Sequence, residues 1–433
     1  MYLQQAQQVE KFLETSRVAT NHGIAWNRTP DGKPVRTLYH GSAGVLLYYL
    51  ELHRSTGNQT YLRKAVLAGD DLLAYVEHKA ASNSFLTIGF YSGWPGYVFV
   101  LNELFKASRE KKFRTAAILA LECMTAQATE MGAGIGWIEP VPFSDITGIT
   151  GEREVVDLSV GAAGAGIIYL YAHREKLTDE ALPLAIKVAD RLLEVAEHTD
   201  QGLRWFMMVD MPFAFTAPNF AHGGAGVGYF LADLYREQPD PRYLDAARSA
   251  ADYIRSRTVE QSEGFLVCHL EEQQPPKTFY LGVCHGPAGT GRLMALLHQI
   301  TGDETYWTWL EANFRGLTST GAPEVRSPGL WQNFGQCCGD AGIGDYALFL
   351  YKQSGNKVYL NFARRIAEHL VKHSETGAGM AWSQAEHRNR PEFTEVQTGY
   401  MQGAAGIGSF LLHFNSISAG KPCKIALPET PFS

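Results

Sequence analysis

Two kinds of apolar pattern alternate along the chain. In residues 59–76, 241–256 and 357–371, apolar residues recur every three or four positions with charges between them. Other stretches, such as the one that follows His40, are apolar almost without interruption. The first pattern is typical of a helix with one exposed face, and the second is typical of a buried helix. The chain is therefore predicted to be all-α, with exposed and buried helices in alternation.

A Gly-x-x-Gly segment opens each buried stretch and recurs seven times. Glycine at the start of a helix lets the backbone turn tightly and lets neighbouring helices approach closely. Seven repeats of one exposed and one buried helix describe two concentric rings. We therefore expect an α/α toroid of seven inner and seven outer helices, in a single domain over residues 1–433. The first glycines of the seven segments, 52 to 68 residues apart, are Gly41, Gly93, Gly161, Gly223, Gly286, Gly339 and Gly403.

The connectors between each exposed helix and the next glycine segment are roughly 15 to 35 residues long, which is more than most loops. Their alternating stretches predict short β-hairpins. Because all the connectors precede inner helices, the hairpins should gather at one rim of the toroid. Several connectors carry a glycine and a tryptophan close together: Gly23 and Trp26, Gly136 and Trp137, Gly202 and Trp205, Gly329 and Trp331, Gly379 and Trp382.

Composition narrows the functional classes. The net charge is −7 with no basic block, which argues against nucleic acid as a partner because phosphate binding needs clustered Lys and Arg. The N-terminus lacks the basic and apolar regions of a signal peptide. No run approaches the roughly 18 apolar residues of a membrane-spanning helix. We therefore expect a cytoplasmic protein without a transmembrane segment, in which the six cysteines form no disulfide framework.

Three cysteines interrupt the pattern in repeats five and six. Cys284 precedes His285 and Gly286, and Cys337 and Cys338 directly precede Gly339. These positions are equivalent, so the side chains should meet where two neighbouring inner helices begin. Zinc binds thiolates at about 2.3 Å, and three protein ligands leave a fourth, catalytic position open. Two alternatives are buried cysteines that only pack as small apolar residues, and a closed structural site with His285 as fourth ligand.

Two further side chains are candidates for acid–base chemistry. His222 directly precedes Gly223 in repeat four, and Asp157 lies four residues before Gly161 in repeat three. A histidine near a metal can transfer protons at neutral pH, and a carboxylate can orient it. A rim histidine alone, such as His40 in repeat one, is more often a hydrogen bonder at a helix entry. In combination with the cysteines, we interpret His222 and Asp157 as functional.

These motifs resemble the lanthionine synthetase cyclase family, the LanC-like proteins. The resemblance rests on the seven glycine segments, the Ala-His-Gly of repeat four and the cysteine motifs of repeats five and six. It implies an α/α toroid with Zn²⁺ at one end of the barrel. It also implies a reaction in which a peptide cysteine thiolate adds to dehydroalanine or dehydrobutyrine and closes a thioether ring.

The resemblance assigns roles to individual residues. Cys284 and Cys337 match the family's cysteine ligands, and Cys338 stands where the repeat-six motif has histidine, as in a branch whose zinc carries three cysteines. His222 matches the residue that protonates the enolate, and Asp157 matches the aspartate that works with it. The chain departs from the family at two other positions. His285 replaces an aromatic residue, and Tyr280 replaces an arginine four positions before Cys284, a charge that Lys277 is one candidate to supply.

The function expected from these features is a zinc-dependent lanthipeptide cyclase. Its partner would be a dehydrated precursor peptide, and because we find no dehydratase segment, a separate dehydratase is expected. One alternative is a LanC-like protein that adds glutathione to dehydrated residues, and another is a non-catalytic, zinc-stabilised toroid that binds peptides. Glycoside hydrolysis needs paired carboxylates, for which Asp157, Asp340 and Asp345 are candidates, but it leaves the cysteines unexplained.

Overall fold

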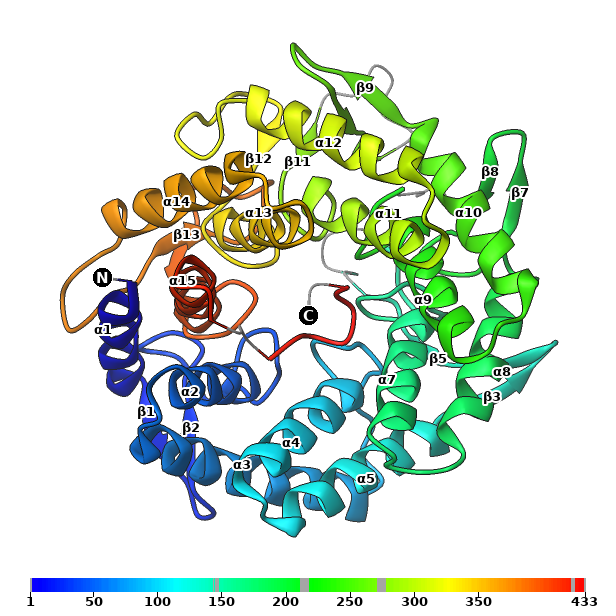
Figure 1. Ribbon diagram of the computed structural model, residues 1–433. Helices are drawn as coiled ribbons and strands as arrows, with labels where there is room; N and C mark the ends of the chain where they lie inside the picture. The colour runs from blue at the N-terminus through cyan, green and yellow to red at the C-terminus, as the bar shows by residue number, and fades with distance from the viewer. Residues whose placement is uncertain are drawn as a thin grey trace.

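The computed structural model describes residues 2–142, 144, 148–210, 218–270, 278–421 and 425–431. Its helices form two concentric rings (Figure 1). The inner ring consists of α2 (Ser42–Thr56), α4 (Trp94–Ser108), α7 (Ala162–Arg174), α9 (Gly224–Glu237), α11 (Pro287–Thr301), α13 (Asp340–Ser354) and α15 (Ala404–Ser418). The outer ring consists of α1 (Tyr2–Thr15), α3 (Gln59–Ala81), α5 (Lys111–Ala126), α8 (Ala181–Glu194), α10 (Pro241–Arg255), α12 (Glu304–Ser319) and α14 (Lys357–Lys372). The predicted toroid of seven inner and seven outer helices is confirmed.

The two helix types differ in burial as the sequence pattern predicts. In α2 every residue from Ser42 to Leu52 is buried, and the other inner helices are similarly enclosed. Outer helices such as α14 bury only the stripe that faces inward. Four outer helices begin with a side-chain cap, which satisfies a free N–H of the first turn: Asn58, Asp240, Asp303 and Asn356. None of the described helices is long and apolar enough to cross a lipid bilayer.

The second glycine of each motif is required by a close backbone approach. A Cβ on Gly289 would lie 1.9 Å from the Val283 carbonyl oxygen, and a Cβ on Gly164 would lie 2.1 Å from the Leu158 oxygen. The equivalent carbonyl lies 1.8 to 2.6 Å from a Cβ in the other five repeats. Any side chain there would overlap the segment that leads into the same helix, so the repeat pattern follows from steric exclusion.

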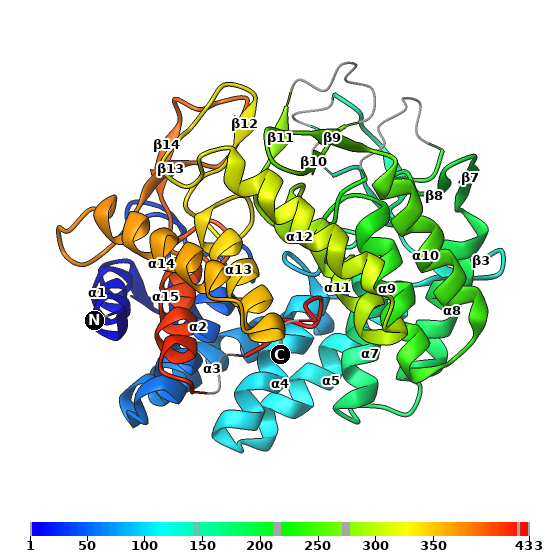
Figure 2. The same cartoon turned by 45° about the horizontal axis from the view of Figure 1, so that its top comes forward.

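The connectors form short strands, as predicted. The six antiparallel pairs in the described part of the chain are β1 (Arg17–Ala19) with β2 (Ile24–Trp26), β3 (Thr129–Met131) with β4 (Gly134–Gly136), β5 (Ile138–Pro140) with β6 (Glu152–Glu154), β7 (Glu197–Thr199) with β8 (Gly202–Arg204), β9 (Thr258–Glu260) with β10 (Phe265–Val267), and β13 (Ser383–Ala385) with β14 (Thr394–Val396). A parallel pair, β11 (Phe279–Tyr280) with β12 (Leu330–Trp331), joins two successive connectors. In Figure 2 the strands β9 to β14 lie together at the top of the toroid.

The connectors link neighbouring outer helices, because their tryptophans bond to the preceding outer helix and their glycines pack on the following one. The Trp137 indole N–H donates to the Met124 carbonyl near the end of α5, and Trp205 and Trp382 donate in the same way to α8 and α14. Glycines of these hairpins lie against the following outer helix, where a Cβ would clash. Gly134, for example, would place a Cβ 1.8 Å from the Lys187 oxygen of α8. Each connector therefore links one outer helix to the next.

The N-terminal helix closes the ring. In Figure 1, α1 lies beside α15, at the place where the other inner helices have an outer partner. The Tyr48 hydroxyl of α2 donates to the Ala6 carbonyl, and the Met380 N–H donates to the Gln8 carbonyl at 3.0 Å. Gly379 packs against the α1 backbone as the other connector glycines pack against theirs. The seventh outer helix is thus the first element of the chain.

The C-terminal segment 425–431 runs inside the inner ring (Figure 1). Its Glu429 accepts a hydrogen bond from the Tyr91 hydroxyl at 2.7 Å and pairs with Arg292 of α11 at 3.0 Å. Both Glu429 and Arg292 are buried. The tail is therefore held in the centre of the toroid by a buried ion pair, which is costly to break because both charges are removed from water.

Replacing a motif glycine by alanine should destabilise the fold. We expect Gly164→Ala to lower the free energy of unfolding by about 1–3 kcal/mol, as overpacking does, although alanine favours helix formation. Gly377→Ala is the matched control, because a Cβ there meets nothing within 4 Å. Urea unfolding of both variants measures the difference. Equal stabilities would contradict the steric account of the repeats.

Candidate functional site

The segments that lead into the inner helices are joined by a closed cycle of backbone hydrogen bonds, which we call the rim ring. In each repeat, the residue two positions before the first glycine accepts a hydrogen bond from the preceding repeat. The seven N···O distances are 2.9 to 3.1 Å. In repeat two the onward donor is Phe90 instead of Tyr91. The ring consists of Tyr39, Tyr91, Ser159, Ala221, Cys284, Cys337 and Met401.

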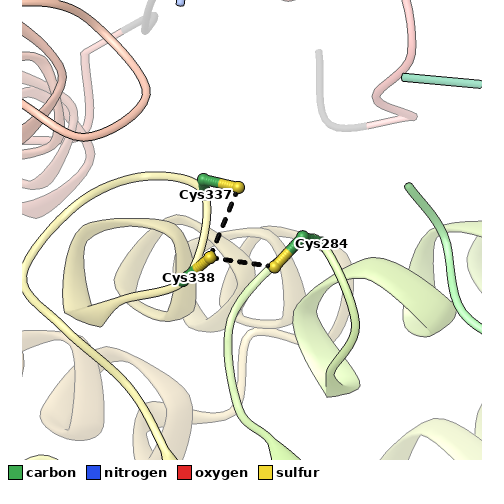
Figure 3. A group of neighbouring side chains, drawn as sticks. All are labelled: Cys284, Cys337 and Cys338. Carbon is green, nitrogen blue, oxygen red and sulfur yellow. Dashed lines mark hydrogen bonds between the residues drawn. The ribbon is translucent and has the colours of Figure 1, made fainter. Parts of the chain in front are cut away.

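Two of the predicted zinc ligands are members of the rim ring. The Cys284 N–H donates to the Cys337 carbonyl at 3.0 Å, and Cys338 follows directly before α13. Figure 3 shows the three sulfur atoms grouped in a triangle, with dashed lines from the Cys338 sulfur to each of the other two. The Sγ atoms of Cys284 and Cys338 are 3.1 Å apart, and those of Cys338 and Cys337 are 3.5 Å apart. The rim ring therefore fixes the spacing of the thiols.

The three thiols are buried and share their protons. Only 4%, 9% and 7% of the surfaces of Cys284, Cys337 and Cys338 are exposed. Hydrogen bonds from Cys284 and Cys338 hold the pKa of the Cys337 thiol well below its usual range. Burial raises the pKa of the Cys284 thiol. Negative charge is thus concentrated on Cys337 while the cluster carries protons.

The cluster fits the ligand set of a metal ion. It is the one group of three or more His, Cys, Asp or Glu residues, within the described ranges, whose ligand atoms all lie within 4.8 Å of one another. Two thiolates on a tetrahedral zinc lie about 3.8 Å apart, given bonds of about 2.3 Å. The sulfurs are therefore already near the required spacing. His285 does not join this group, and its Nδ1 is buried without a hydrogen-bond partner.

His222 and Asp157 form a close pair. His222 Nδ1 and Asp157 Oδ2 are 2.6 Å apart, and the other carboxylate oxygen of Asp157 accepts the Val160 N–H at 2.7 Å. The carboxylate is buried and the imidazole is largely so. Because Nδ1 faces a carboxylate, we assign the shared proton to Nδ1, which leaves Nε2 as the atom that exchanges protons. The N–H of Ala221, which precedes His222, donates to the Cys284 carbonyl at 2.9 Å, and the His222 ring is 5.3 Å from the ring of His285, so the pair lies beside the thiol cluster.

The lanthionine synthetase C-like family model matches residues 35–419 of the chain. The chain belongs to this family. The resemblance seen in the glycine and cysteine motifs is thereby confirmed. No curated protein matches this LanC-like chain by sequence.

Solved structures support the fold of this LanC-like protein. "Nisin cyclase" superimposes with a TM-score of 0.62 at 15% identity, over 98% of this chain and 95% of that one. A D-mannose isomerase superimposes with a TM-score of 0.51 at 13% identity, over 95% and 96% of the two chains. A cellobiose 2-epimerase from Bacillus thermoamylovorans B4167 has a TM-score of 0.50 at 10% identity, over 95% and 98%. At these identities the likeness shows the fold alone, and function has to be argued from the site.

Tyr39 and Gln402 contact the thiols, and neither was selected as a candidate from the sequence. The Tyr39 hydroxyl hydrogen-bonds to Cys337. Gln402 Nε2 lies 2.9 Å from that hydroxyl and 3.8 Å from Cys338 Sγ. Tyr39 stands two positions before Gly41 and Gln402 directly before Gly403, and this placement at the helix entries is the signal that could have identified them. Their polar groups stabilise negative charge on sulfur.

The connector of repeat seven brings a carboxylate to the rim. Glu386 Oε1 lies 3.0 Å from His40 Nε2, and its Oε2 lies 3.0 Å from Arg28 Nη2. Burial alone would raise the pKa of Glu386, but the hydrogen bond and charge of His40, together with Gln397 and Arg28, lower it to about 2. The His40 side chain is thus held by a carboxylate from the other end of the chain.

Tyr280, which stands where the family has an arginine, lies beside two histidine rings. Tyr280 ends β11, with its ring 4.9 Å from the His285 ring and 4.3 Å from the His269 ring. Lys277, the candidate for the missing charge, lies outside the described residues.

Glu386 should make stability depend on pH in the acid range. Its pKa is lowered in the folded chain, so its carboxylate stabilises the fold above about pH 4.5, and this contribution disappears as the pH falls toward 2. We expect Glu386→Gln to cost up to about 3 kcal/mol at pH 7 and progressively less below pH 4.5. Urea unfolding from pH 7 to pH 3 measures this, with the half-exposed Glu395→Gln as control. A difference from wild type that is constant with pH would contradict the assignment.

Proposed function

We propose that this protein is a zinc-dependent lanthipeptide cyclase. In this role it adds the cysteine thiolates of a dehydrated precursor peptide to dehydroalanine or dehydrobutyrine, and a separate dehydratase prepares the peptide. The observation that carries the proposal is the convergence of three buried thiols beside a histidine–carboxylate pair at one rim. Family membership supports the same reaction class.

Cys284, Cys337 and Cys338 would hold the zinc. Three sulfur ligands leave the fourth position of a tetrahedral ion for a substrate, in contrast to a closed structural site. When bound, zinc supplies Lewis acidity that lowers the pKa of an incoming thiol. The hydrogen bonds from Tyr39 and Gln402 fix the orientation of two of the ligands and offset part of their negative charge.

His222 is the acid of the proposed reaction. When a thiolate attacks the β-carbon of the dehydroamino acid, a carbon–sulfur bond forms and the π electrons move onto the carbonyl oxygen. A proton from His222 Nε2 then reaches the α-carbon, and the carbonyl forms again. Asp157 stabilises the protonated imidazole and holds its orientation through Nδ1.

Glycoside hydrolysis has less support, because its candidate carboxylates have other partners. Asp340 pairs with Arg326 at 3.2 Å, Asp345 pairs with His413 at 2.8 Å, and Asp157 pairs with His222. The thiol cluster has no part in such a reaction.

Metal content tests the proposed zinc site. We expect about one zinc per chain in the wild type and a loss of most of it in Cys337→Ala, because two thiolates bind zinc far more weakly than three. Cys123→Ala on α5 is the matched control, since this cysteine is outside the cluster. Elemental mass spectrometry of the purified proteins gives the ratio. A folded wild type that contains no zinc and cannot be loaded with it would refute the zinc site.

Substitution of the acid tests the reaction. With a synthetic peptide that carries one cysteine and one dehydroalanine, we expect His222→Asn to slow ring closure by 10²- to 10⁴-fold, the usual contribution of a general acid. Asp157→Asn should show a smaller loss, and both variants should keep their zinc. His298→Asn is the control, since it lies near the other end of α11.

Ring closure leaves the peptide mass unchanged, so the assay counts the thiols that remain open to alkylation. If the protein attaches glutathione to the dehydroalanine in place of closing the ring, the site belongs to the alternative function, glutathione addition to dehydrated residues. A zinc-loaded wild type that does neither would favour a peptide-binding toroid.

A further inference from the structure

Arg388 is a cation at the rim that has no carboxylate partner among the described residues. Other arginines near this end are paired, Arg28 with Glu386 and Arg326 with Asp340. The Arg388 side chain is half-buried, and its Nε is buried without a hydrogen-bond partner. Its guanidinium instead lies beside the hydroxyl of Tyr280 and interacts with it. A guanidinium held in this way keeps its full charge for a ligand.

The loop between β13 and β14 carries Arg388 and is fastened to the segment that precedes the cysteines. Gln384 accepts the Phe334 N–H at 2.6 Å, and the Ala385 carbonyl accepts from Asn333 Nδ2 at 3.1 Å. One residue later, Glu386 is held by His40. The loop is therefore anchored in repeats six and one, and Arg388 reaches from it to Tyr280 in repeat five.

Ring contacts connect Tyr280, the neighbour of Arg388, with His222, the proposed acid. The Tyr280 ring is 4.9 Å from the His285 ring, which is 5.3 Å from the His222 ring. The His269 ring contacts both, at 4.3 Å from the Tyr280 ring and 4.5 Å from the His285 ring. Burial, together with the charges of Arg388 and His222, lowers the pKa of His269 to about 3. His269 is therefore neutral at neutral pH, and Arg388 supplies the positive charge at this side of the site.

We propose that Arg388 binds the carbonyl oxygen of the dehydroamino acid and stabilises the negative charge that this oxygen gains during thiolate addition, while Tyr280 positions the guanidinium. The inference rests on the proposed cyclase function. In the step concerned, the new carbon–sulfur bond pushes the π electrons to the oxygen, and the charge disappears when His222 protonates the α-carbon. No other reactant is needed.

Two physical arguments favour this role. A half-buried guanidinium without a counter-ion among the described residues has lost part of its hydration and is compensated only when an anion arrives, so it favours the enolate over the uncharged substrate. A carboxylate partner would cancel this charge, whereas a tyrosine hydroxyl holds the group without neutralising it. Charge placed where an oxyanion develops contributes about 10²- to 10³-fold to the rate in enzymes.

The test compares Arg388→Gln, Arg388→Lys and the control Arg390→Gln in the full chain. Arg390 is exposed and lies in the same loop. The probe is the synthetic peptide with one cysteine and one dehydroalanine, and kcat and KM are measured together with zinc content and thermal unfolding. We expect Arg388→Gln to lower kcat by 10²- to 10³-fold with KM within about threefold of wild type. Arg388→Lys should recover part of the loss, and Arg390→Gln should match the wild type.

Three outcomes would overturn the inference. An unchanged kcat removes Arg388 from the reaction, a rise in KM alone assigns it to binding of the ground state, and a loss of zinc or folding in both Arg388 variants gives it a structural role. The failure of the cyclase function itself is distinct, because then the zinc-loaded wild type would already be inactive on the peptide.

Discussion

The rim ring is the constraint on which the rest of the structure depends. Seven backbone hydrogen bonds, one between each repeat and the next, close a cycle that joins the seventh repeat to the first and sets the spacing of the helix entries. Each inner helix starts directly after this cycle, and the motif glycines make the tight entry possible. A side chain beside the ring is therefore placed by backbone geometry, which is stiffer than the packing of side chains alone.

This arrangement explains how a fold that is also found in a D-mannose isomerase and a cellobiose 2-epimerase can hold a cluster of three thiols. The positions next to the rim ring are equivalent in all repeats, yet each carries a different side chain. In the proposed enzyme, Cys284 and the pair in repeat six would provide soft ligands, and His222 would provide a proton donor held by a carboxylate. Hydrogen bonds to Cys337 lower the pKa of its thiol. Function is thus specified by a few residues on a scaffold that repeats.

The sequence predicted those parts of the structure that repeat. Glycines at fixed offsets reveal the seven inner helices because any side chain there would overlap the backbone, and alignment of the repeats then places the three cysteines together. Contacts between distant segments were not predictable. The pairing of Glu386 with His40 joins residues more than 300 positions apart, and nothing in the local pattern of residues 2–15 identifies α1 as the outer partner of α15. Arg388 lies in the loop between β13 and β14, and the equivalent loop of repeat three, between β5 and β6, differs in length, so alignment could not relate Arg388 to Tyr280.

The position of α1 has a consequence for the order of events during synthesis. The apolar face formed by Ala6, Val9, Phe12 and Leu13 is synthesised nearly four hundred residues before α15, which covers it. Until α15 follows, this helix has only its contacts with the neighbouring α2 and α3, and the growing chain is an open arc. Assembly must therefore finish with a contact of very high sequence separation, a kind that slows folding and invites pairing between two nascent chains.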